Sequence, residues 1–180
     1  MIDLPALVLA VLISAWLVVC AVCDWRKREV PNALTVVPFM LAVLWSAWSG
    51  NAPAALLAVA MMFVTNLDNV PAIAVSLLSS AFAIILSFFI QEVNVQNLLP
   101  ILIIVGISLL WYFGGTGGAD AKILITLTLL FGYPAFIYAI VAGGLAGLVG
   151  LAKKDKQLPY VIPVAAGTIL YLVVRTITIF

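Results

Sequence analysis

The chain has 180 residues, of which 66% are hydrophobic and 8% are charged, and its formal net charge is +1. So little polar surface excludes a water-soluble globular protein of this size. The small net charge indicates no nucleic-acid partner. Lipid is therefore the expected solvent. Because no segment alternates apolar and polar residues as a membrane barrel does, the sequence predicts an all-α membrane protein.

Hydrophobic runs separated by polar, glycine or proline breaks predict the helices in chain order. The runs cover residues 4–23, 33–49, 53–66, 71–90, 98–113, 121–131, 135–151 and 159–178. A bilayer core roughly 30 Å thick requires about 20 helical residues, and the third and sixth runs are shorter than that. The prediction is a polytopic helix bundle with six to eight transmembrane helices, in a single integral-membrane domain over residues 1–180.

The first run is too long for the core of a signal peptide and lacks a basic leader, so we expect it to be a retained helix. Cys20 and Cys23 form a C-x-x-C pair at its end. A zinc site would need further ligands, and the chain has neither a second cysteine pair nor a histidine. No metal site is expected.

The basic residues predict how the chain crosses the membrane. If it turns back at Gly132-Tyr133-Pro134, seven basic residues fall on one side of the membrane: Arg26, Lys27, Arg28, Lys122, Lys153, Lys154 and Lys156. The positive-inside rule makes that side the cytoplasm. The same three residues are also compatible with a kink in one long helix. A kink would place the last lysines outside, so the turn is preferred, and Asp24 and Asp120 then share the cytoplasmic face.

These two aspartates stand beside apolar helices. Asp24 follows directly on the first run, where an ordinary interfacial residue would also stand. Asp120 begins the sixth run, where an aspartate serves as a helix N-cap. A cap does not require the four glycines that precede it within residues 114–119. Such glycines permit close approach of an extended peptide. A phosphate-binding loop is disfavoured because the Gly-Lys-Ser/Thr ending is absent.

The segment from Asp24 through Arg28 to Pro31-Asn32, together with Gly-Gly-Ala-Asp-Ala-Lys over residues 117–122, resembles the type IV prepilin peptidases and archaeal preflagellin peptidases. These are GxGD intramembrane aspartic peptidases. The resemblance implies that Asp24 and Asp120 are the catalytic pair. The residues implied to bind substrate or support the site are Gly117, Gly118, Ala119, Lys122, Pro31 and Asn32.

The same resemblance implies a multi-pass protein of a prokaryotic plasma membrane with its active site toward the cytoplasm. Its substrate would be a pilin-like or flagellin-like precursor, whose leader peptide it cleaves. Membrane lipid is the other expected partner, no nucleic acid is expected, and the oligomeric state is left open. The zinc-binding domain that long family members use for N-methylation has no counterpart in the sequence. A short form without a cofactor is therefore implied.

Two departures from the family pattern stand out. Ala119 occupies the position of the second glycine of the family motif, and its small side chain makes the change tolerable. The two aspartates are widely spaced, and residues 66–97 look like an inserted helical hairpin. Within this insertion Asp68 is the reserve candidate for the catalytic pair, and Glu92 is expected in an external loop.

Two other classes of protein compete with the peptidase. A small ion-coupled membrane transporter also uses intramembrane carboxylates and broken helices. It would place them near the bilayer midplane and show related halves, and no internal repeat is visible. A non-catalytic scaffold would not need two aspartates on one face beside a glycine run.

Overall fold

The computed structural model describes residues 4–64, 78–86, 95–114, 116–153 and 159–178. Within these residues all regular structure is helical, which confirms the predicted all-α class. The helices are α1 (Leu4–Lys27), α2 (Asn32–Trp48), α3 (Ala52–Val64), α5 (Val95–Tyr112), α6 (Gly118–Phe131), α7 (Tyr133–Lys153) and α8 (Val161–Thr178), with a further helical stretch over residues 78–86.

Two helix boundaries differ from the predicted ones in a way that matters for function. The first helix continues past residue 23 to Lys27, so Asp24 lies in its last turn instead of following it. Hydropathy marks where the apolar residues end, whereas backbone hydrogen bonds continue, and basic residues in the last turn suit the helix dipole. Helix α6 begins at Gly118 and not at residue 121, with Gly117 as its N-cap. The expectation that Asp120 begins this helix as its N-cap is therefore wrong.

Several predictions fall outside the described residues. Asp68, Glu92, Lys154 and Lys156 lie there entirely, as does most of the predicted 66–97 hairpin. Of the predicted 71–90 helix, the described part over residues 78–86 is helical.

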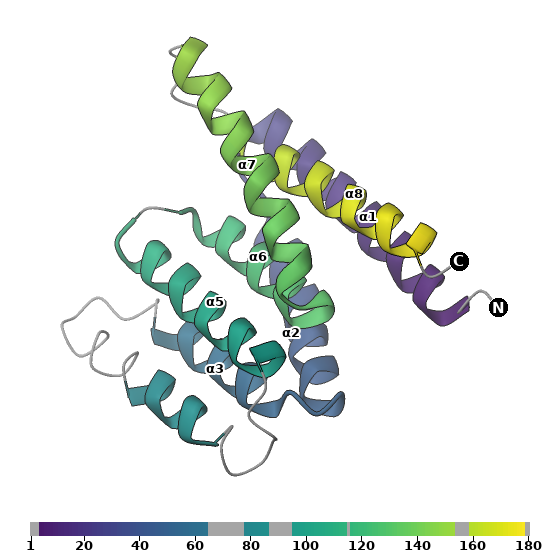
Figure 1. Cartoon of the computed structure of the whole chain (residues 1–180). Coiled ribbons are helices and arrows are strands. Elements are labelled where there is room, and N and C mark those ends of the chain that lie inside the picture. The colour runs from purple at the N-terminus through teal and green to yellow at the C-terminus, as the bar shows by residue number, and fades with distance from the viewer. Residues whose placement is uncertain (1–3, 65–77, 87–94, 115, 154–158, 179–180) are drawn as a thin grey trace. The chain divides into compact units, whose positions relative to one another are not determined.

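The chain divides into two compact units, one formed by Met1–Leu34 with Pro134–Phe180 and the other by Thr35–Tyr133. In the first unit α1 and α8 pack side by side and run in opposite directions (Figure 1). In the second unit α5 packs against α3 and α6. A single peptidase domain over residues 1–180 stays a prediction.

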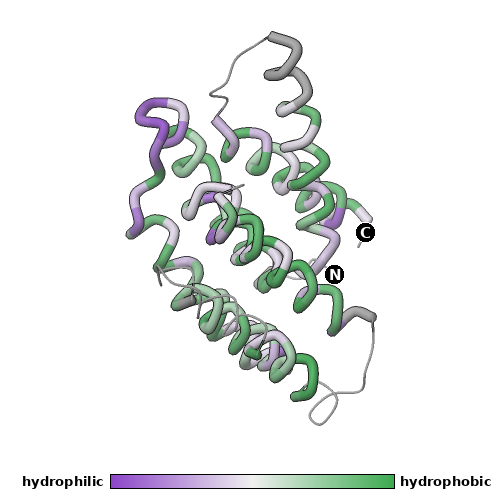
Figure 2. The backbone as a smooth tube through the Cα atoms, turned by 90° about the vertical axis from the view of Figure 1, so that its left-hand side faces the viewer, coloured by the Kyte–Doolittle hydropathy of each residue, from purple (hydrophilic) through white to green (hydrophobic). Residues whose placement is uncertain are grey.

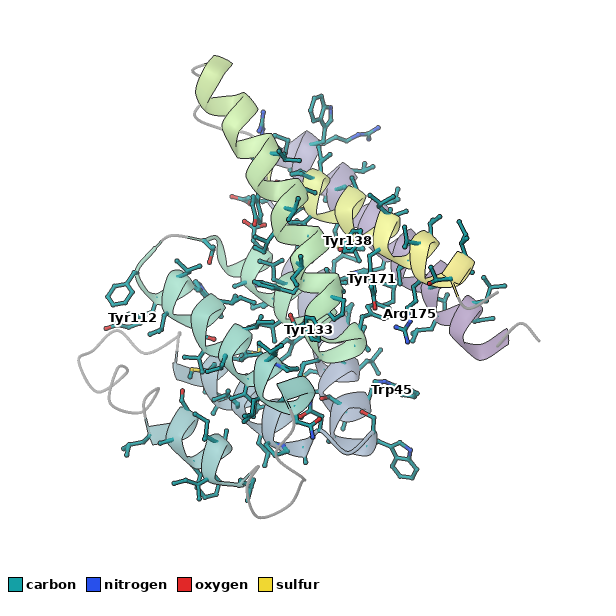
Figure 3. The ribbon with its side chains drawn as sticks, in the orientation of Figure 1. Trp45, Tyr112, Tyr133, Tyr138, Tyr171 and Arg175 are labelled. Carbon is teal, nitrogen blue, oxygen red and sulfur yellow. The ribbon has the colours of Figure 1, made fainter. Side chains whose placement is uncertain are left out.

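Helices α7 and α8 of the first unit approach closely because small residues stand between them. A Cβ atom added at Gly167 would collide with the carbonyl oxygen of Tyr138 and lie 2.7 Å from the Cβ of Ala142. The rings of Tyr138 and Tyr171 lie next to each other (Figure 3), with centroids 5.5 Å apart and planes tilted by 53°. Small residues allow membrane helices to pack at such short range.

The predicted break near residue 132 is confirmed. Helix α6 ends at Phe131, and Gly132 has φ 75° and ψ −167°, with its amide bonded to the carbonyl of Thr128. This positive φ favours glycine, which has no Cβ. Helix α7 begins at the next residue, Tyr133. Whether the chain reverses its direction across the membrane here stays a prediction.

Two helical segments of the described chain, Leu7–Lys27 and Val161–Thr178, are long and apolar enough to cross a membrane. Four shorter apolar segments accompany them: Asn32–Trp48, Ala52–Phe63, Asn97–Tyr112 and Tyr133–Gly147. Hydrophobic residues dominate the helices, and hydrophilic ones are concentrated in a few places (Figure 2). Large apolar side chains are widely exposed, among them Leu12, Leu44 and Phe63. Exposure of this extent is typical of a surface that meets lipid or a partner.

Candidate active site

Asp24 lies in the last turn of α1 and is only 9% exposed. Its Oδ2 accepts a hydrogen bond of 3.0 Å from the backbone amide of Val161. Val161 is the first residue of α8, and amides in the first turn of a helix have no partner within that helix. The carboxylate therefore satisfies a free donor at the start of a helix that is far away in the sequence.

This contact also offsets an unfavourable location. A carboxylate in the last turn of a helix lies near the partial negative charge of that helix end. The amino end of α8 carries the opposite partial charge and supplies the donor. Since a buried polar group without a hydrogen bond is costly, the Val161 amide accounts for the burial of Asp24.

The end of α1 fixes the backbone of Asp24 as well. Arg28 has φ 56°, in the left-handed region, and its amide donates to the carbonyl of Asp24 at 2.9 Å. A left-handed residue directly after the last helical one is a common way to stop a helix. The chain then reaches Pro31 and Asn32, two of the predicted supporting residues, which are exposed at the start of α2.

A side chain of α1 bonds a backbone carbonyl of α2 that a proline leaves unpaired. Pro38 lies inside α2 and has no amide hydrogen to donate to the carbonyl of Leu34, four residues earlier. The indole Nε1 of Trp16, in the middle of α1, donates to that carbonyl at 2.7 Å. Trp16 therefore replaces the hydrogen bond that the proline removes, and it fixes the first turn of α2 against α1.

Asp120 lies in the second unit, at the third position of α6. A Cβ added at Gly117 would be 3.1 Å from Asp120 Oδ2, so the carboxylate reaches back over the residue that precedes the helix. Gly117 and Asp120 thus lie together at the start of α6, and the predicted supporting role of Gly117 stays a prediction. The hydroxyl of Thr116 is buried and has no hydrogen-bond partner among the described residues. It is therefore a buried polar atom of this loop whose hydrogen-bonding capacity is unused there.

The aromatic ring of Trp111, near the end of α5, holds the start of α6. A Cβ added at Gly118 would lie 3.1–3.2 Å from this indole. The ammonium of Lys122 lies 5.8 Å from the ring centroid, within the range of a cation–π interaction. Gly118 and Lys122 are four residues apart and share one face of α6. Of the remaining predicted residues, Ala119 is half-buried in the same turn.

Several site residues were not predicted from the sequence: the Val161 amide, Trp111, Trp16 and the left-handed Arg28. Two of them had a signal. Pro163 at the third position of α8 is typical of a first helical turn, and Pro38 leaves the Leu34 carbonyl unpaired. Nothing in the sequence places Trp111 against Gly118, because that contact depends on how α5 and α6 pack.

Each unit thus contains one carboxylate at a helix end, Asp24 in the first unit and Asp120 in the second. Because the chain contains no histidine, the nucleophile–histidine pairs of many hydrolases are not available to it. Two carboxylates are able to divide the roles of general acid and general base between them.

The model of the type IV leader peptidase family matches residues 11–152. This range includes Asp24, the glycine run and Asp120, and it ends before α8. No curated protein and no solved structure matches the chain.

Proposed function

This chain belongs to the type IV leader peptidase family, and from that premise we propose that it is an intramembrane aspartic endopeptidase. Asp24 and Asp120 are its catalytic pair, and it cleaves the leader peptide of pilin-like or flagellin-like precursors at the cytoplasmic membrane face. The observation that carries the proposal is the buried carboxylate of Asp24, held through Oδ2 by the amide of Val161 at 3.0 Å.

The proposed reaction divides proton transfer between the two carboxylates. One takes a proton from a water molecule as the water attacks the scissile carbonyl carbon, and the other donates a proton to the carbonyl oxygen. The amide nitrogen then leaves with a proton from the pair. Two carboxyl groups at close range cannot both be ionised, so a pair that shares one proton is prepared for this step.

The proposed site for the substrate backbone is the turn before α6. Gly117 and Gly118 have no side chain to obstruct an extended peptide. Lys122 and the exposed Pro31 and Asn32 are proposed to support the site or to contact the leader.

The proposed topology is multi-pass, with the start of α2 and the glycine turn on the cytoplasmic side. Arg26 and Lys27 in the last turn of α1 support it, since basic residues mark the cytoplasmic ends of membrane helices. Helix α2 has 17 residues. At 1.5 Å per residue it rises roughly 25 Å, close to the thickness of a bilayer core. The shorter apolar helices therefore come near to the length of a full crossing.

The transporter alternative gains no support from the family match. Ion-coupled carriers bind their ions near the bilayer midplane. Asp24 and Asp120 instead lie in the last and first turns of their helices.

The experiment that tests the function is cleavage of a pilin-type precursor in membranes that contain the protein. Wild type is compared with Asp24→Asn, Asp120→Asn and Asp68→Asn, after the amount inserted in the membrane has been matched by immunoblot. Loss of either catalytic carboxylate should lower the rate by about 1,000-fold or more. Asp68→Asn is the control for loss of a carboxylate elsewhere and should retain cleavage. Cleavage that survives Asp24→Asn or Asp120→Asn would remove the proposed pair.

A further inference from the structure

We propose that the backbone amide of Val161 is the positioning group for the Asp24 carboxylate, and that Oδ1 is consequently the oxygen that exchanges protons during the reaction. The inference rests on the proposed function, because it concerns the same carboxylate. It adds a residue of α8, which lies beyond the matched family range of 11–152.

The geometry leaves the two carboxylate oxygens in different situations. Oδ2 accepts the amide of Val161 at 3.0 Å. Among the described residues, this amide is the one hydrogen-bond donor to the carboxylate. A carboxyl oxygen that accepts an N–H is the carbonyl-like one, so a proton on Asp24 resides on Oδ1. Oδ1 is therefore the oxygen that exchanges protons with the water molecule and with the scissile amide.

The donor is itself held in place by buried groups. The Val161 side chain is 2% exposed. The preceding residue, Tyr160, presses its ring against Gly143 of α7, where an added Cβ would lie 2.9 Å from a ring carbon. Helix α8 runs alongside α1 (Figure 1). The start of α8 is thus fixed against both neighbouring helices, and the amide direction is fixed with it.

An aspartate side chain has two rotatable bonds, and one hydrogen bond to a fixed donor restricts both. This restriction matters for rate, since a misplacement of about 1 Å in a reacting group costs on the order of 100-fold. The Val161 amide therefore acts through Asp24 and does not touch the substrate.

Proline supplies a sharp test because it removes the amide hydrogen that Val161 donates. Val161 is the first residue of α8, a position at which helices accept proline, and Tyr160 before it lies outside the helix. Val161→Pro is compared with Val161→Ala, since both lose the valine side chain and only the alanine variant keeps the amide hydrogen. We expect kcat for precursor cleavage to be about 10- to 100-fold lower in the proline variant than in the alanine variant, with KM changed less than threefold by the same comparison.

Ile162→Pro is the matched control for a proline in this turn, because it leaves the amide of Val161 intact. Its kcat should exceed that of Val161→Pro by at least about tenfold. Equal kcat values in Val161→Pro and Val161→Ala, or an equal loss in Ile162→Pro, would overturn the positioning role. Asp24→Asn and Asp120→Asn are measured in the same assay. If either of these still cleaves, the proposed function fails, whereas failure of the Val161 comparison alone leaves that function standing.

A second measurement does not depend on the proline variant folding. Amide hydrogen exchange at Val161 is followed in wild type and in Asp24→Ala, with the helix-interior amide of Thr168 as an internal reference. Unpaired amides of a first helical turn exchange quickly, so exchange at Val161 should be at least about tenfold faster in Asp24→Ala, with Thr168 unchanged. Identical exchange at Val161 in the two proteins would show that the bond does not form.

Discussion

The two carboxylates are held in opposite ways. Asp24 lies at the carboxyl end of its helix and depends on a donor from α8, which is 137 residues away in the sequence. Asp120 lies in the first turn of α6, and its carboxylate reaches back over Gly117, three residues earlier. The first of these contacts is tertiary and the second is local.

The difference indicates which contacts hold each carboxylate in place. A carboxylate at a helix amino end suits the helix dipole, whereas one at the carboxyl end opposes it. The amino end of α6 therefore suits Asp120, whereas Asp24 needs α8 to be correctly packed. Substitutions far from both carboxylates should therefore displace Asp24 more than Asp120.

The largest effect is expected where α8 meets α7. Gly167→Ala places a Cβ against the backbone carbonyl of Tyr138, which cannot move aside as a flexible side chain would. We expect a loss of about 3 kcal/mol in the free energy of unfolding, measured by unfolding in detergent micelles, together with reduced cleavage. The Val161 amide is then displaced along with α8.

Gly144→Ala on α7 is the control for this substitution. Nothing lies within 4 Å of an added Cβ at Gly144. Alanine is the better helix former by about 1 kcal/mol, so stability should be unchanged or slightly higher. If Gly167→Ala and Gly144→Ala have the same free energy of unfolding, the close approach of α7 and α8 does not stabilise the helix that positions Asp24.

A smaller effect is expected from loss of the hydrogen bond between the Trp16 indole of α1 and the Leu34 carbonyl of α2. Trp16→Phe removes the indole donor and leaves the Leu34 carbonyl without the bond that Pro38 cannot supply. The expected cost is about 2 kcal/mol, measured in the same unfolding assay.

A double-mutant cycle isolates this interaction. Pro38→Ala restores an amide that is able to donate to the Leu34 carbonyl, so Trp16→Phe should cost much less in the Pro38→Ala background than in wild type. An equal cost in both backgrounds would mean that the tryptophan acts through packing and not through its hydrogen bond.

The left-handed residue that ends α1 should have a still smaller effect. Arg28 has φ 56°, which glycine and asparagine adopt readily and β-branched residues resist. Arg28→Gly, Arg28→Asn and Arg28→Val all lose the same positive charge. The valine variant should be less stable than the other two by about 1 kcal/mol. Equal stability of the three variants would contradict a left-handed stop at this position.

The sequence was sufficient for the features that depend on local composition. Apolar runs predicted the helices, and the Gly132 break followed from residues close together in the chain. Helix ends were less predictable. Hydropathy stopped the first helix at residue 23, whereas the hydrogen-bonded helix continues to Lys27.

Contacts between distant segments could not be predicted. The bond from the Val161 amide to Asp24 depends on a backbone atom, which has the same chemistry in every residue except proline. The contact of Trp111 with Gly118 depends on the packing of α5 on α6, which no pattern within either helix specifies. The hydrogen bond donated by Trp16 was predictable only in part. Pro38 identifies the unpaired carbonyl of Leu34, but only the fold identifies its donor.

The smallest effect on stability is expected around Asp120. A Cβ at Gly118 would lie 3.1–3.2 Å from the Trp111 indole, so the ring must shift by a few tenths of an ångström. Gly118→Ala should cost less than about 1 kcal/mol, and the cost should disappear in a Trp111→Leu background. Gly117→Ala meets Asp120 Oδ2 at 3.1 Å instead. Its backbone, at φ −68°, accepts alanine, so stability should hold while kcat falls because the carboxylate is displaced. If Gly118→Ala unfolds as readily as Gly167→Ala, the position of Asp120 depends on tertiary packing as much as that of Asp24 does.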